Sequence, residues 1–466
     1  MIAPVLQRLS LLAAIALSMI TDLRGGELRV GAAQVVITPP PGTPMAGYYH
    51  LRESSEVLDD IYAKALVFEQ DDQTAAIVVC DLISLPRHTV VAARKAIESR
   101  TGLPGDHVLL AATHAHTGPV IARESSFDDF DGGSTEPAVS YTDALPGLIA
   151  ESVDRAINRL SPARTLAANT TVENLAFNRR FWMDDGTVSW NPRKLDPGIV
   201  APAGPHDPEV GMLFFETPNR DANVIGAFVN YAMHPDTTGG TRISADFPGV
   251  LARRLAEMEG PELVTVFANG ACGNLNHRNV WWADPQHGPG ETARLGNILA
   301  GAVLGAWPSL APVETSAPRV RSEIVKLPLR ELTETDLEEA REVVRRTRAN
   351  KAQFMEQVKA FRVLDVMARD QKPHEVEVQV IALGPEIAFV SLPGEIFVEL
   401  GLAIKAASPF KYTFIAELAN GSIGYIPNAP AYAEGNYEVV SARCAEGSGE
   451  LLVEAATRLL RALHAK

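Results

Sequence analysis

The sequence contains few cysteines, and they are far apart. Cys80, Cys272 and Cys444 are the only three among 466 residues. This number excludes the dense disulfide framework that holds small exported domains together, although two of the three could still form a single bridge. A hydrophobic core must stabilise the chain instead, and its length and 46% hydrophobic content are sufficient to build one.

Positive charge and long apolar runs are also scarce. The 42 basic residues are outnumbered by 57 acidic ones, which gives a net charge of −15, and no basic run is longer than a pair such as Arg345-Arg346. This balance disfavours nucleic acid as a partner. Beyond residue 20, no apolar run is long enough to cross a bilayer.

Residues 1–26 have the pattern of an export signal. Arg8 precedes the apolar run 9–20, which is long enough for the hydrophobic region of a signal peptide and too short for a comfortable membrane span. We expect the mature chain to begin between Thr21 and Gly26 and to be secreted or periplasmic. No clean Ala-x-Ala cleavage site follows, so an uncleaved tether that allows contact with a membrane surface is the alternative.

Residues 27–466 predict a single α/β domain with a mixed β-sheet core flanked by helices, because short apolar strands alternate with amphipathic helices and no linker or repeat interrupts them. The expected strands are Arg29–Ile37, Ala63–Glu69, Ala75–Cys80, Val108–Ala112, Gly211–Phe215, Val224–Tyr231, Leu263–Ala268, Val376–Leu383, Ile387–Leu392 and Tyr412–Ala416. The expected helices are Thr89–Arg100, Ala144–Leu160, Phe247–Glu259, Ile396–Ala407 and Leu451–His464.

Two helix boundaries have specific signals. Phe247–Glu259 is expected to bury Leu251, Leu255 and Met258 on one face and to stop at Gly260. A helical insertion is expected near residues 332–370, opened by the capping box Thr335-Asp-Leu-Glu338 and broken near Asn350. We interpret this charge-rich insertion as a solvated cover without a role in chemistry.

The motif Thr113-His-Ala-His-Thr-Gly-Pro119 is the strongest indication of function. It follows the strand-like run Val108–Ala112, and in an extended backbone residues i and i+2 face the same side, so His114 and His116 are expected to enter one pocket. Neutral imidazole is the commonest protein ligand of zinc, and a second imidazole nearby can transfer protons. The motif therefore indicates hydrolytic metal chemistry.

Two further candidate ligands follow predicted strands, and the ends of strands are where α/β folds collect their ligands. His234 follows the apolar strand that ends near Tyr231, and Glu395 follows the strand Ile387–Leu392. Two histidines and a glutamate form a common catalytic zinc set. Each residue alone could instead be structural, His234 as a strand cap and Glu395 as a helix N-cap.

Several ordered motifs resemble the neutral/alkaline non-lysosomal ceramidase superfamily, whose signature Thr-His-Thr-His-Ser-Gly-Pro is similar to residues 113–119. The other similar segments are Gly31–Thr38, Met45–Tyr48, Asn178-Arg179, Met233-His234, Ile243–Asp246, Pro393–Glu395, Gly424-Tyr425 and Asn436–Glu438. The resemblance implies the α/β fold of the catalytic domain in that family.

The resemblance also implies one zinc ion per chain, held by four side chains: His114, His234, Glu395 and Tyr425. It implies that His116 and Arg179 act on the scissile amide, with Tyr437 beside it. A metal lowers the pKa of a water toward neutrality, and His116 could take the proton of that water and deliver it to the leaving amine. Arg179 and Tyr425 could stabilise the developing oxyanion.

One motif departs from the family. Asn276 stands where the ceramidases carry a catalytic serine, and an amide nitrogen cannot act as that nucleophile. We expect Asn276 to donate a hydrogen bond to substrate while activated water attacks, His277 to add a polar contact, and Asp246 either to line the pocket or to cap a helix. The sequence also ends soon after Glu450, without the immunoglobulin-like C-terminal domain of the full-length ceramidases.

The sequence therefore predicts an exported zinc-dependent hydrolase of an amide bond in an N-acylated substrate, either a ceramide-like lipid or another N-acyl compound such as an amino sugar. The alternatives are a zinc enzyme that acts on an ester or a carbohydrate, and a binding protein that retains the fold without catalysis.

Overall fold

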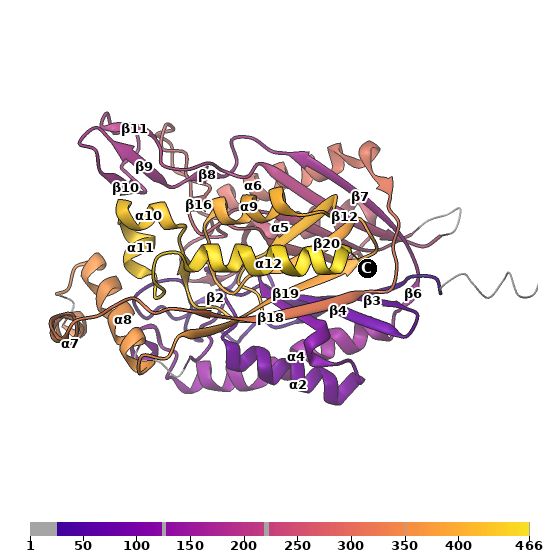
Figure 1. Ribbon diagram of the computed structural model, residues 1–466, viewed down its shortest axis with the longest axis horizontal. Helices are drawn as coiled ribbons and strands as arrows, with labels where there is room; N and C mark the ends of the chain where they lie inside the picture. Colours follow the sequence, from indigo (N-terminus) through magenta and orange to yellow (C-terminus); the bar gives the residue numbers. More distant parts are fainter. Residues whose placement is uncertain (1–25, 124–126, 219–222, 350, 466) are drawn as a thin grey trace, which may run out of the picture.

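The computed structural model describes residues 26–123, 127–218, 223–349 and 351–465, and these form three mixed β-sheets with helices outside them (Figure 1). The first sheet has the order β5-β4-β3-β1-β6, the second β15-β13-β12-β7-β17 and the third β18-β19-β20-β22. Each sheet is antiparallel apart from one parallel pair, which is β4–β5, β13–β15 and β20–β22 respectively.

The bounds of these strands are β1 (Arg29–Val36), β3 (Tyr62–Gln70), β4 (Gln73–Cys80), β5 (Val108–Ala112), β6 (Ser161–Pro162), β7 (Arg164–Thr171), β12 (Glu209–Glu216), β13 (Val224–Tyr231), β15 (Thr265–Asn269), β17 (Ala311–Pro312), β18 (Arg319–Leu327), β19 (His374–Leu383), β20 (Ile387–Ser391) and β22 (Tyr412–Ala416).

A shared core lies between the three sheets. Strand β3 illustrates how it is built, because successive side chains of a strand face opposite sides. Leu66 and Phe68 join the central core, where Phe68 lies 5.3 Å from Phe215 of the second sheet and 6.2 Å from Phe389 of the third, measured between ring centroids. Side chains from all three sheets therefore pack into one cluster, which fixes the sheets relative to one another.

Each sheet covers its other face with helices. Ala65 and Val67 of β3 pack into the cluster beneath α2 (Arg87–Thr101) and α4 (Glu136–Ile157). The second sheet packs against α5 (Asp246–Glu259) and α6 (Pro289–Gly305), and the third against α9 (Val398–Ala407) and α12 (Ser448–His464). Strands such as β5, β20 and β22 are buried on both faces, which explains their nearly continuous apolar sequences.

Smaller elements surround the ends of the three sheets. Figure 1 shows the sheet β9 (Arg180–Met183), β10 (Val188–Trp190), β11 (Ile199–Pro202) and the hairpin of α7 (Glu334–Arg348) and α8 (Phe354–Ala368) near the same end of the molecule. The remaining elements are β2 (Glu56–Val57), α3 (Asp128–Asp131), β8 (Phe177–Asn178), β14 (Arg242–Ile243), β16 (Leu275–Asn276), β21 (Glu395–Ile396), β23 (Tyr425–Ile426), α10 (Ala429–Glu434), α11 (Tyr437–Ser441) and the short 3₁₀ turns η2 (Gly105–His107) and η3 (Trp307–Ser309).

The predicted α/β class is confirmed, and β5, β13 and β22 have their predicted bounds. Two local predictions are wrong. Met258 is 66% exposed, because it falls beyond the buried face formed by Leu251 and Leu255. The capping box of α7 uses Thr333 and Asp336, so the N-cap lies two residues before the predicted one.

The predicted export signal lies outside the described residues. The three cysteines are buried and free within the described part of the chain. In the same part, no helix combines the length and apolar character required to span a membrane.

Candidate metal centre and substrate pocket

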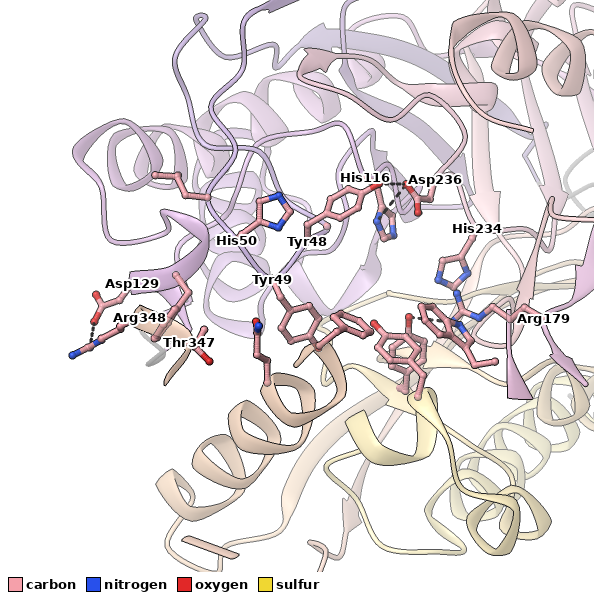
Figure 2. Close-up of a pocket in the computed structure, with 18 residues that line it drawn as sticks. Tyr48, Tyr49, His50, His116, Asp129, Arg179, His234, Asp236, Thr347 and Arg348 are labelled. Carbon is pink, nitrogen blue, oxygen red and sulfur yellow. Dashed lines mark hydrogen bonds and ion pairs between the residues drawn. The ribbon is translucent and has the colours of Figure 1, made fainter. Parts of the chain in front are cut away.

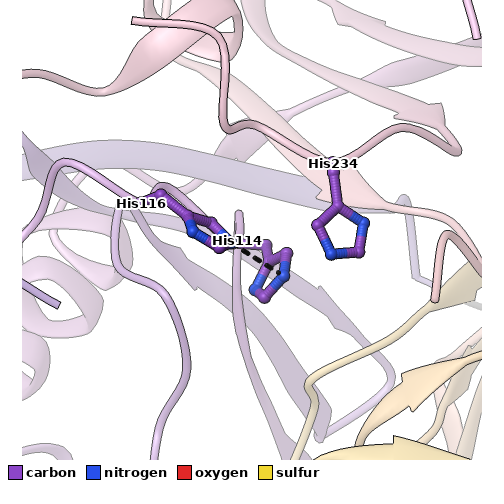
Figure 3. A group of neighbouring side chains, drawn as sticks. All are labelled: His114, His116 and His234. Atoms are coloured by element: carbon purple, nitrogen blue, oxygen red, sulfur yellow. Dashed lines mark hydrogen bonds between the residues drawn. The ribbon is translucent and has the colours of Figure 1, made fainter. Parts of the chain in front are cut away.

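Three histidines converge where two of the sheets end (Figure 3). His114 and His116 follow β5, and His234 follows β13. One ring nitrogen of each lies within 4.8 Å of the others, so the group can hold a metal ion. The ring centroids of His114 and His234 are 4.5 Å apart, and those of His114 and His116 are 4.7 Å apart.

The two histidines of the motif meet by a different route from the predicted one. We expected an extended backbone to align them, but β5 ends at Ala112 and His114 has a left-handed φ of 74°. Such a conformation is strained for a residue with a Cβ, and strain of this kind gathers at functional sites. A turn, rather than strand periodicity, therefore brings His116 beside His114.

Glu395 joins the cluster from the third sheet. Its Oε2 lies 3.4 Å from Nε2 of His114 and 3.3 Å from Nε2 of His234. Glu395 also pairs with Tyr425 through the short parallel bridge between β21 and β23, which sets the tyrosine next to the carboxylate. The four predicted metal ligands thus lie together although they are spread over residues 114–425.

Backbone carbonyls fix the orientation of two imidazoles. Nδ1–H of His114 donates to the carbonyl oxygen of Ile83 at 2.8 Å, and Nδ1–H of His234 donates to that of Cys272 at 2.9 Å. Both rings therefore present an Nε2 lone pair to the cluster, which is the tautomer a metal requires. Burial alone would lower the pKa of His114, but the Glu395 carboxylate raises it overall, whereas burial lowers the pKa of His234 well below its usual value.

The donor set fits a cation. Nε2 of His234 and Oε2 of Glu395 are buried, and no described group forms a hydrogen bond with either atom. Burial would raise the pKa of Glu395, but the two histidines hold it well below its usual range, so the carboxylate is ionised. Two facing acceptors 3.3 Å apart with no hydrogen between them are unfavourable unless a positive charge separates them.

His116 differs from the other two histidines. Its Nε2 is 3.3 Å from Nε2 of His114, and its Nδ1 lies 3.9 Å from Oδ1 of Asp236 without a hydrogen bond among the described residues. Burial lowers the pKa of His116 well below its usual value, so the ring is neutral. Gly47, at φ 101°, packs so closely that a Cβ there would be 2.6 Å from Nδ1 of His116.

Arg179 is buried beside the cluster and is paired by the protein itself. Its Nε donates to Oε1 of Glu438 at 2.8 Å, and its Nη2 donates to the carbonyl of Gly273 at 2.6 Å and to the hydroxyl of Tyr425 at 3.0 Å. Oε2 of Glu438 accepts from Nη1 of Arg180 at 3.0 Å. One carboxylate therefore bridges two buried guanidinium groups, of which Arg180 also pairs with Glu434.

A second layer supports His234. The Cys272 thiol donates to Oε1 of Glu417 at 2.8 Å, and the backbone N–H groups of Cys272 and Ile396 donate to Oε2. Burial raises the pKa of Glu417 to about 8. Because the carbonyl of Cys272 receives the Nδ1–H of His234, this network orients the loop on which that imidazole depends.

A cavity of about 750 Å³ opens above the cluster (Figure 2). His116, His234, Arg179, Tyr425 and Tyr437 are among the residues that line it. The α7–α8 hairpin contributes Thr347, Arg348, Phe354 and Gln357 to its wall. The hairpin is therefore part of the pocket wall, and its interpretation as a cover without a role in chemistry stays a prediction.

Three of the predicted site residues turn their polar atoms elsewhere. Nδ2 of Asn276 donates to Oδ1 of Asn191 at 2.9 Å, and its Oδ1 accepts from the backbone of Arg278. Nε2 of His277 lies 2.7 Å from the carbonyl of Gln286. These bonds engage both polar atoms of Asn276 and direct His277 into its own loop, and neither residue is among the described residues that line the cavity.

Asp246 is the third of these residues. Its carboxylate accepts from the backbone N–H groups of Thr237, Thr238 and Phe247 and from the hydroxyl of Thr237. It therefore holds the loop after His234 against the start of α5. Asp246 is the first residue of that helix, whose N-cap is Ala245 without a side-chain capping bond, and it is not among the described residues that line the cavity.

Several pocket residues had no separate signal in the sequence. Asp236 lies two residues after His234, and Trp190 and Phe354 come from β10 and α8. Proximity to a candidate ligand could have identified Asp236. The positions of Trp190 and Phe354 depend on how β10 and α8 pack, which no local pattern reveals.

Comparisons with known proteins identify the fold. No protein-family model matches the sequence, and no curated protein is detectably similar. The structure is similar to a solved neutral ceramidase from Pseudomonas aeruginosa, with a TM-score of 0.73, 18% identity, and coverage of 94% of this chain and 75% of that one. A structure described as ceramidase complexed with C2 gives a TM-score of 0.71, 18% identity, and coverage of 94% and 76%. The chain therefore has a neutral ceramidase-like fold.

Proposed function

We propose that this protein is a zinc-dependent hydrolase of an amide bond in an N-acylated substrate, with one zinc ion per chain. The main support is the pair of buried acceptors, Nε2 of His234 and Oε2 of Glu395, which face one another at 3.3 Å. The similarity to solved ceramidases makes an amide the first bond to test, and ceramide-like lipids are one class of N-acyl compound to include.

In this proposal, His114, His234, Glu395 and Tyr425 hold the metal and His116 does not. The carbonyls that anchor Nδ1 of His114 and His234 support this division, since metal-ligating histidines usually have such a partner. Nδ1 of His116 has no such anchor among the described groups. The alternative is a three-histidine site that includes His116 as a ligand.

Zinc bound here would polarise the substrate carbonyl and increase the acidity of a water. His116 is neutral and lies beside the cluster, so it can accept a proton at a ring nitrogen and later donate it to the leaving amine. Tyr425 can donate a hydrogen bond to the developing oxyanion, and Arg179 positions that hydroxyl through the bond from Nη2. Because Asn276 carries an amide, which is not a nucleophile, and is held by Asn191 and Arg278, we assign the attack to water rather than to this side chain.

The test combines metal analysis with a screen of amides and esters on the purified protein. We expect about one zinc per chain in the wild type and in His116→Ala, loss of zinc in His234→Ala, and loss of turnover in both variants. His88→Ala, an exposed histidine on α2, is the matched control and should keep both properties. Loss of zinc in His116→Ala would favour the three-histidine site, and bound zinc without turnover of any substrate would favour a binding protein.

We further propose that the protein is exported, a proposal that rests on the sequence of residues 1–26 alone. N-terminal sequencing of protein recovered from the extracytoplasmic fraction should give a start between Thr21 and Gly26. An intact start in a membrane fraction would indicate the uncleaved tether instead.

A further inference from the structure

An aromatic wall lines one side of the cavity. Trp190 and Tyr437 have ring centroids 4.4 Å apart at 32°, and Phe354 lies 6.0 Å from Trp190 at 20° and 5.6 Å from Tyr437 at 25°. Phe354 is thus nearly parallel to the other two rings, which are tilted against each other, and the three form one aromatic cluster although they come from β10, α11 and α8. Phe354 is 41% exposed, so its ring remains accessible to a ligand.

One polar atom of this wall has no partner. Nε1 of Trp190 is buried, and no described acceptor receives its hydrogen. A buried indole N–H normally finds an acceptor, and leaving it unpaired is unfavourable. Trp190 lines the cavity, but Nε1 itself is buried, so an oxygen of a bound ligand reaches this donor only when the indole shifts toward the cavity.

Polar side chains line other parts of the cavity, alongside the apolar Leu51 and Phe130. The hydroxyl of Tyr48 donates to Oδ1 of Asp236 at 3.0 Å, and the outer rim carries His50 together with Asp129 and Arg348, whose charged groups are 3.8 Å apart (Figure 2). An alkyl chain laid along this cavity would cover these groups without offering them hydrogen bonds, which is unfavourable. The lining instead suits a ligand with one apolar face and hydroxyl groups along its edges.

We propose that the cavity recognises an N-acylated amino sugar, with one face of the pyranose ring packed on Trp190, Phe354 and Tyr437 and its acyl amide directed toward His116 and His234. This inference rests on the proposed amidase function and narrows its substrate class. A pyranose combines an apolar face of C–H groups with hydroxyls at its edge, which suits aromatic rings beside polar side chains, and a shift of the indole would let one hydroxyl accept the hydrogen of Nε1 of Trp190. The cavity, at about 750 Å³, is within the usual range for small-molecule sites.

Two measurements test the substrate class. The first compares kcat/KM of the zinc-loaded protein for N-acetylglucosamine and for N-acylsphingosines of short and long chain. The second measures calorimetric binding of glucosamine, the product that cannot be hydrolysed further. Each is repeated for Trp190→Ala, for Trp190→Phe, which keeps a ring and removes the N–H, and for Trp281→Ala as a matched control, because Trp281 lines a separate cavity. Thermal denaturation verifies that every variant is folded.

We expect the sugar amide to be preferred, and Trp190→Ala to raise both KM and the Kd of glucosamine about tenfold while kcat changes less, since stacking acts on binding. Trp190→Phe should lie between the wild type and Trp190→Ala, and Trp281→Ala should resemble the wild type. Preference for N-acylsphingosine, or binding of glucosamine that does not depend on Trp190, overturns the substrate class and leaves the amidase proposal standing. Binding of glucosamine that depends on Trp190, without hydrolysis of any amide, supports the ligand class and refutes the amidase proposal.

Discussion

Replacing Glu438 with glutamine tests whether one buried carboxylate holds the two arginines beside the candidate metal centre. The side chain of Glu438 is fully buried, and those of Arg179 and Arg180 are 5% and 2% exposed. Arg180 has a second partner, Glu434, at 3.0 Å. Arg179 has no other carboxylate among the described residues, so Glu438→Gln leaves its charge buried with only neutral partners.

The magnitude follows from this geometry. Removing one partner of a buried ion pair costs about 3–5 kcal/mol of unfolding free energy. The glutamine keeps one acceptor oxygen, and Arg180 keeps Glu434, so we expect the lower end of that range, about 3 kcal/mol. In a chain of this length each kcal/mol shifts Tm by about 1 °C, which gives a decrease of about 3 °C.

Calorimetry of the zinc-loaded protein measures this shift, and Glu434→Gln is the matched control. Glu434 is 17% exposed and shares Arg180 with Glu438, so its loss leaves both arginines paired and should cost about 1 kcal/mol or less. Equal Tm values for the two variants would refute the argument that the Glu438 carboxylate stabilises the buried charge of Arg179.

Three further predictions concern the stability of the fold in acid, the close contact between Gly47 and His116, and the removal of zinc. Burial would raise the pKa of Glu377, but Arg94 and Arg87 lower it below the usual value of 4.5. The ionised carboxylate therefore stabilises the fold above pH 4.5, and this contribution disappears as the pH falls through the lowered pKa. In urea titrations, Glu377→Gln should be about 3 kcal/mol less stable than the wild type at pH 7, and the difference should be smaller in acid. Gly47→Ala should displace His116 and reduce turnover at least about tenfold with zinc retained, whereas Gly42→Ala, with φ 90° and no described atom within 4 Å of its Cβ, should add strain without that loss. If zinc is present at about 1,000 times its Kd, adding a chelator should lower the Tm of the wild type by about 4 °C. The Tm of His234→Ala should not change when the chelator is added.

Much of the fold was predictable from local patterns. Strands such as β5 and β13 are buried on both faces, so their apolar runs stand out from the flanking turns. Strand β18 was missed because it is an edge strand whose side chains, including Ile324 at 52% exposure, face solvent in an irregular pattern.

The candidate site was predictable only in part. His114, His234 and Glu395 each follow a buried strand, so their convergence could be anticipated from the end of the sheet at which such residues gather. The orientation of the Asn276 side chain could not be predicted, because it depends on a hydrogen bond to Asn191, a residue 85 positions away in a loop. The same reason applies to the pairing of Glu438 with Arg179 across 259 positions.

The three sheets contribute one candidate ligand each, since His114 follows the first sheet, His234 the second and Glu395 the third. An ion bound by all three ligands would link the three sheets at the edge of the shared core. Its binding free energy would add to the stabilisation from the apolar packing between the sheets. Thermodynamic linkage works in both directions, so a cavity created in the distant core at Phe389 should weaken the retention of zinc even though no ligand is touched. Zinc affinity would thus report on how tightly the whole domain is assembled.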